Sequence, residues 1–146
     1  MVPLTLAQKL KEAGLSWTPA KNDFFAIPNR GFDDTVFVIS DMTTLLEKVY
    51  GQLSVTFYGV AEWALDHIMV AELVWLPTEA QVRELLEQHL VGQNEPALTL
   101  TSTSTGYRCQ IRWQEQLLAF EAFGAAEVYG LALCHLLETE SPLTIP

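Results

Sequence analysis

The chain has 146 residues, of which 49% are hydrophobic and 10% aromatic. A chain this apolar can bury a core, so the composition excludes intrinsic disorder and predicts one domain, or at most two small joined halves. Its 18 acidic residues against 8 basic ones give a formal net charge of −10. Such a charge disfavours binding to nucleic-acid phosphates or to an anionic membrane, so we expect neither as a partner.

Two further features of the sequence predict a cytoplasmic protein. The N-terminal residues lack the basic and apolar regions of a secretory signal, and no run approaches the ~18 apolar residues of a membrane helix. Cys109 and Cys134 lie among apolar neighbours, where free cysteine behaves as a small hydrophobe. We expect two buried thiols, and a disulfide is the alternative.

The first forty residues predict a helix followed by a pair of strands. Thr5 is placed to cap the helix and Gly14 to end it. The stretches 23–28 and 36–39 are predicted to be the first and second strands. Asn and Gly at 29–31 favour a turn, which predicts antiparallel pairing of the two strands.

The middle of the chain is harder to assign. A second helix is predicted over 41–50, with an apolar face of Leu45, Leu46 and Val49 and with Gly51 as its stop. A strand is predicted over 53–58. Residues 59–69 suit either a helix or an irregular connection, and 70–76 predicts another strand.

The last part carries the clearest pattern. Thr78 and Gln81 form a capping-box spacing at the start of a helix that ends at Gly92. A short strand, a polar hairpin connection, two more strands and an amphipathic helix follow; these elements are 97–101, 102–106, 107–113, 117–123 and 125–138.

These elements together predict an α+β fold, with about four helices packed against an antiparallel β-sheet and a C-terminal β-β-α unit. We expect residues 1–138 to form a single compact domain and residues 139–146 to form a flexible tail.

The residue types that usually serve in catalysis give little support for an enzymatic activity. The sequence contains no nucleophile elbow, phosphate loop or dinucleotide fingerprint, and its three histidines lack the spacing of paired ligands on one helix face. We therefore predict no catalytic residue, metal or cofactor, and a non-enzymatic role is favoured. The alternative is a small-ligand- or metal-binding protein, or an enzyme, with a pocket near Glu62, Asp66 and His67.

Aromatic residues are numerous for a small sheet. Because neighbours on a strand point to opposite faces, adjacent aromatic pairs cannot both face the core. An exposed aromatic patch suits a protein partner, while helices on both faces of the sheet would hide it. We expect a protein-interaction or regulatory module, including a homodimer, that acts through a sheet edge or an aromatic patch. The candidate residues are Phe24, Trp63, Trp75 and Trp113.

Several stretches resemble small uncharacterised bacterial and phage-type proteins. They are Gly14–Trp17, Asp23–Pro28, Trp75–Thr78 and the closing strand–strand–helix. This last part, with Gly130–Cys134 on its helix, is similar to small α/β sandwich domains encoded by phages and mobile elements. The likeness covers about half of the chain and implies no activity, because such families have none assigned.

Overall fold

The computed structural model describes residues 1–32, 35–40, 44–57 and 68–140. Their fold is α+β, as predicted. The described residues hold three α-helices and three antiparallel sheets of three strands each, so the expectation of about four helices on a single sheet is wrong in detail.

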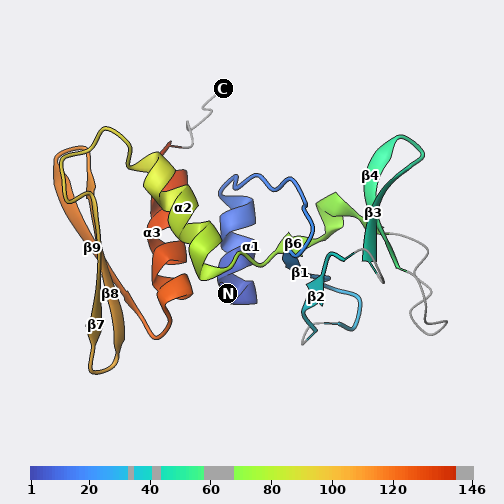
Figure 1. Cartoon of the computed structure of the whole chain (residues 1–146), viewed down its shortest axis with the longest axis horizontal. Coiled ribbons are helices and arrows are strands. Elements are labelled where there is room, and N and C mark those ends of the chain that lie inside the picture. Colours follow the sequence, from blue (N-terminus) through green and yellow to red (C-terminus); the bar gives the residue numbers. More distant parts are fainter. Residues whose placement is uncertain (33–34, 41–43, 58–67, 141–146) are drawn as a thin grey trace. The chain divides into compact units, whose positions relative to one another are not determined.

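The chain divides into two compact units (Figure 1). Unit 1 comprises residues 1–15 and 77–146, and unit 2 comprises residues 16–76. The single domain expected over residues 1–138 stays a prediction.

Unit 1 places helices on one face of a three-stranded sheet (Figure 1). The strand order is β7-β8-β9, and both pairings are antiparallel. Helix α3 packs on β8 and β9, and both α2 and α1 pack against α3. The elements are α1 (Leu4–Glu12), α2 (Glu79–His89), β7 (Leu98–Thr103), β8 (Gly106–Trp113), β9 (Gln116–Ala122) and α3 (Ala125–Glu140).

Local signals account for most boundaries in unit 1. The predicted capping box of α2 is confirmed, because Thr78 Oγ1 accepts from the Gln81 amide at 3.3 Å and Gln81 Oε1 accepts from the Thr78 amide at 2.9 Å. The cap expected at Thr5 is wrong. Pro3 occupies the N-cap of α1 and makes no side-chain hydrogen bond there. Proline is compatible with this position because its fixed φ suits the start of a helix. Gly14 follows α1 with φ +102° and ends the helix as predicted.

The core of unit 1 lies between the sheet and its helices. Cys109 and Ile111 of the central strand are fully buried, and across the sheet Ile111 faces Leu98 and Leu118. On α3, Gly130 is buried. Helix α1 lies close to it, because a Cβ at Gly130 would lie 2.8 Å from Leu6 Cδ2.

Unit 2 contains two small antiparallel sheets, with strand orders β2-β1-β6 and β3-β4-β5. The predicted antiparallel pair β1–β2 is confirmed, with Phe25 opposite Phe37. The elements are β1 (Phe24–Ala26), β2 (Phe37–Val38), β3 (Thr44–Val49), β4 (Gln52–Phe57), β5 (Ile68–Met69), the 3₁₀ turn η2 (Val70–Glu72) and β6 (Val74–Trp75).

Two elements of unit 2 correct the sequence predictions. The helix expected over 41–50 is wrong, because β3 pairs with β4 along its whole length. Tyr50 and Gly51 both have positive φ, 53° and 78°, which is the geometry of a tight hairpin turn rather than a helix stop. The strand expected over 70–76 is shortened, since η2 occupies its first half.

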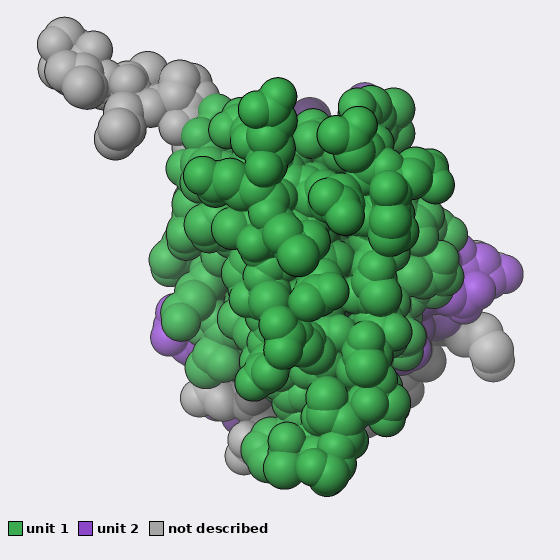
Figure 2. Space-filling model, turned by 90° about the vertical axis from the view of Figure 1, so that its left-hand side faces the viewer, with its two compact units in different colours: residues 1–15, 77–146 green, residues 16–76 purple. Residues whose placement is uncertain are grey.

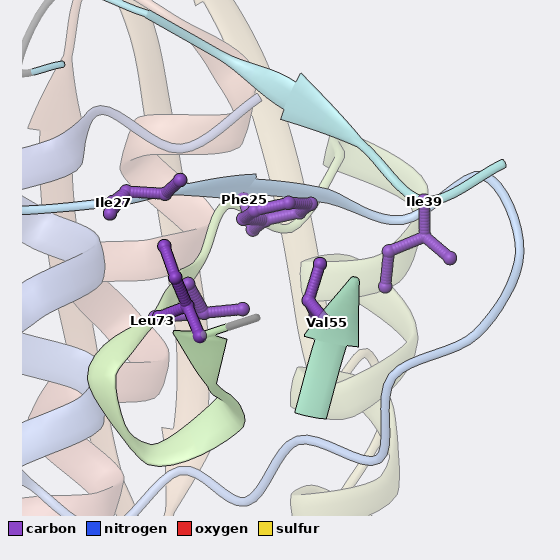
Figure 3. Close-up of a cluster of buried hydrophobic side chains, with 6 residues drawn as sticks. Phe25, Ile27, Ile39, Val55 and Leu73 are labelled. Carbon is purple, nitrogen blue, oxygen red and sulfur yellow. The ribbon is translucent and has the colours of Figure 1, made fainter. Parts of the chain in front are cut away.

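A cluster of buried side chains links the two sheets of unit 2 (Figure 3). Phe25 and Ile27 lie on one side of the cluster, and Val55 and Leu73 face them from β4 and the η2–β6 connection. All four are at most 1% exposed, so this cluster forms a hydrophobic core between the two small sheets.

Candidate interaction surface

The aromatic residues predicted to bind a partner do not form one group. Phe24 and Trp75 are half-buried on adjacent strands of unit 2, where the Leu76 amide donates to the Phe24 carbonyl at 2.9 Å. Trp113 is half-buried in unit 1 at the end of β8. Trp63 lies outside the described residues.

The half-buried Trp75 side chain packs against another aromatic residue of unit 2. Its ring stacks on Trp17, with the ring centroids 6.2 Å apart and an interplanar angle of 2°. Trp17 in turn is held by Asp23, whose carboxylate accepts from the indole Nε1 at 3.0 Å and from the Ala20 amide at 3.0 Å. A role of Trp75 in binding stays a prediction.

The alternative pocket falls largely outside what the structure describes. Glu62, Asp66 and His67 all lie in the segment 58–67, which is not among the described residues. In the remainder of the chain, no group of three or more His, Cys, Asp and Glu side chains is placed to hold a metal ion.

Two pockets in unit 1 lack an evident reactive pair. One of about 370 Å³ beside the β7–β8 turn contains Glu121 and Tyr107, and one of about 420 Å³ after α2 contains Glu87 and Glu95. Neither lining includes a histidine, cysteine or lysine.

The described histidines and cysteines have structural contacts. His89 Nδ1 lies 2.9 Å from the Leu85 carbonyl, and its Nε2 lies 3.3 Å from the Glu140 carboxylate at the end of α3. The expected free, buried thiols are confirmed. Burial raises the pKa of Cys109 and of Cys134 to about 11, so neither thiol is ionised at neutral pH and neither is an activated nucleophile.

The outer edge of β7 presents unpaired peptide groups. Arg112 donates its backbone N–H to the Ala97 carbonyl at 3.0 Å, which fixes the alternation of hydrogen bonds along β7 and β8. Every second residue from Ala97 therefore bonds to β8. The peptide groups of Leu98, Leu100 and Ser102 point away from it, and no backbone hydrogen bond among the described residues reaches them.

This edge also lacks the usual protection against pairing. Natural edge strands are blunted by charged side chains, by proline or by bulges. Residues 97–105 contain neither a charged residue nor a proline, although the whole chain carries a net charge of −10. The other edge strand, β9, includes Glu121 and follows Glu115. The uncharged edge of the sheet is therefore β7.

The face of the sheet opposite the helices is mostly polar, and Leu117 is its one large exposed apolar side chain among the described residues. Figure 2 looks onto the side of unit 1 (green) that carries the sheet. Thr99, Thr101 and Arg108 are exposed there, and Arg108 lies 4.0 Å from the exposed Glu121 on the next strand. A polar face of an antiparallel sheet is stable when it is exposed to water. The feature of this sheet that lacks a partner is therefore the β7 edge and not the face.

Sequence reasoning predicted a strand here but did not single it out as an interaction edge. The strand predicted over 97–101 continues to Thr103 and turns tightly through Ser104 and Thr105. Alternation of Leu with Thr or Ser, without any charge, was the available signal. Among the described residues, the most exposed large apolar side chains also differ from the predicted ones; they are Tyr50, Phe123 and Val91, at 92%, 85% and 79% exposure.

No protein-family model, curated protein or solved structure matches the chain. The resemblance to bacterial and phage-type proteins therefore carries no further argument. Within the described residues, every helix is too short or too polar to cross a membrane.

Proposed function

We propose that the chain is a non-enzymatic protein-interaction module, in which the edge of β7 accepts an extended strand from a partner. The observation that carries the proposal is the row of unpaired peptide groups at Leu98, Leu100 and Ser102 on an uncharged strand. Adding a strand to an exposed sheet edge is a recurring mode of peptide recognition, in which backbone hydrogen bonds give affinity.

The side chains of β7 would select among partner strands. Leu98 and Leu100 face the helices and are half-buried, whereas Thr99 and Thr101 are exposed on the opposite face. A docked strand would cover the open sides of both leucines. It would also satisfy peptide groups whose hydrogen bonds each contribute about 0.5–1.5 kcal/mol net. A partner strand of alternating apolar and polar residues fits this arrangement best.

Amide hydrogen exchange measured by NMR tests the proposal. The probe is a synthetic peptide with the sequence of residues 96–105, added to the chain at a protein concentration where its mass is that of one chain. We expect the amides of Leu98, Leu100 and Ser102 to exchange fast in the free chain and at least tenfold more slowly with the peptide. Thr99 and Thr101, already bonded to β8, should change little.

A matched pair of variants controls this experiment. Ser102→Pro removes one outward N–H, and proline is tolerated on an edge strand where its missing N–H faces solvent. Ser102→Thr keeps that N–H. The peptide should protect Leu98 and Leu100 in Ser102→Thr and much less in Ser102→Pro. If millimolar peptide leaves all three outward amides of the wild type unprotected, β7 is not a docking edge.

A further inference from the structure

We infer that the strand accepted by β7 is β7 of a second copy of this chain, paired antiparallel about a two-fold axis at Leu100. This inference rests on the proposed function and names its partner. The two three-stranded sheets would then form one continuous sheet. Its helices would lie on one face, because a two-fold axis that relates antiparallel strands is perpendicular to the sheet.

The positions of the outward peptide groups select this register. With Leu100 opposite its own copy, Leu98 lies opposite Ser102, so all the outward groups are paired through about six hydrogen bonds. Sliding the register one way pairs Ser102 with Pro96, which has no N–H. Sliding it the other way pairs Leu98 with Ser104, which lies in the turn. Both alternatives lose hydrogen bonds.

The side chains are self-complementary in the same register. Leu100 meets its copy on the helix side of the sheet, and Thr99 lies opposite Thr101 on the polar face. Apolar pairs and threonine pairs across strands are both favourable. Self-pairing of β9 about Ala119 would instead bring Glu121 of each copy opposite Leu117 of the other. That arrangement would place carboxylates at the interface of two acidic chains.

Two features limit the affinity of the dimer: the charge repulsion between the copies, and an interface that consists of one strand from each copy. Two chains of net charge −10 repel one another, and this repulsion between exposed charges is screened by salt. We therefore expect a weak dimer, half-formed at a concentration on the order of 0.1 mM, whose population rises as NaCl is added.

Sedimentation equilibrium tests the association. The wild type and Ser102→Thr should shift from the 16.3 kDa of one chain toward twice that mass as concentration rises. Ser102→Pro, with an unchanged circular dichroism spectrum, should stay at the mass of one chain. A wild type that stays at that mass up to about 0.5 mM overturns the inference.

Cysteine variants test the register. Under mild oxidation, T99C mixed with T101C should give a covalent dimer, because these positions face each other closely in the non-hydrogen-bonded pairs. Either variant alone should give little. Cross-linking of T99C alone, or of T101C alone, indicates a register shifted by one pair and overturns the placement at Leu100. The native thiols are buried and should not interfere.

The peptide experiment separates failure of this inference from failure of the proposed function. If the peptide protects the outward amides but the chain stays monomeric, β7 docks a strand and only the second copy is wrong. If neither effect is seen, both proposals fall together.

Discussion

The close approach of α1 to α3 at Gly130 gives the sharpest test of how unit 1 is packed. A Cβ at Gly130 would lie 2.8 Å from Leu6 Cδ2, 3.5 Å from Leu6 Cγ and 3.5 Å from Val2 Cγ2. The nearest of these atoms ends a flexible side chain, so an added methyl needs only a small shift of Leu6. A larger side chain at Gly130 cannot be accommodated by a shift of Leu6 alone, because it would displace α1.

The expected costs follow from these contacts. Gly130→Ala should lie within about 1 kcal/mol of the wild type, since the gain in helix propensity, about 1 kcal/mol, offsets the shift of Leu6. Gly130→Leu should destabilise unit 1 by about 2–3 kcal/mol, because overpacking a filled core costs about 1–3 kcal/mol or more. Gly124→Leu is the control, since a Cβ at Gly124 meets nothing within 4 Å.

Urea unfolding followed by circular dichroism at 222 nm measures these differences, because all the α-helices that the structure describes belong to unit 1. A double-mutant cycle adds specificity. Leu6→Ala should cost at least 1 kcal/mol less in the Gly130→Leu chain than in the wild type, since the smaller side chain makes room. Equal midpoints for Gly130→Leu and the wild type would refute the packing of α1 on α3.

Three further outcomes are expected. Asp23→Ala should destabilise unit 2 by about 1–3 kcal/mol in unfolding followed by tryptophan fluorescence, because the Trp17 indole loses its acceptor. Replacing Gln114 and Glu115, which have φ of 50° and 66°, with Asn-Gly should raise the unfolding free energy of unit 1 by about 1 kcal/mol. Burial raises the pKa of Cys109 from 9.0 to about 11, so the unfolded chain ionises first. The stability contributed by the protonated thiol is complete below pH 9 and is lost as the pH rises toward 11. Cys109→Ala should reduce this loss in pH-dependent unfolding curves and leave the part due to Cys134, whose pKa burial also raises to about 11.

The elements that were predicted correctly are those specified by neighbouring residues. The capping box of Thr78 and Gln81 and the amphipathic pattern over 125–138 are local signals, and they led to the right helices. The segment 44–49 was misassigned because its apolar residues fit a helical stripe about as well as a buried strand. Its partner β4 and the tight turn at Tyr50 decide between the two.

The features that were not predicted depend on distant pairings. β1 forms its sheet with β6, so that Phe25 lies opposite Trp75, far along the chain, and no local pattern encodes that choice. The candidate edge has the same origin. The outward direction of the Leu100 peptide follows from the two-residue turn after Thr103, and a one-residue slip would reverse it. The absence of charge along β7 can be read from the sequence, but only the sheet order makes this strand an edge.

Amide exchange of the unmodified chain over a range of concentrations tests the central claim most directly. Exchange at Leu100 should slow as the chain is concentrated from about 10 μM to 0.5 mM, because more of the β7 edge becomes paired. Exchange at Ala119, whose peptide faces outward on β9, should stay constant. Exchange at Leu100 that is independent of concentration, or slowing at Ala119 instead, would contradict pairing through β7.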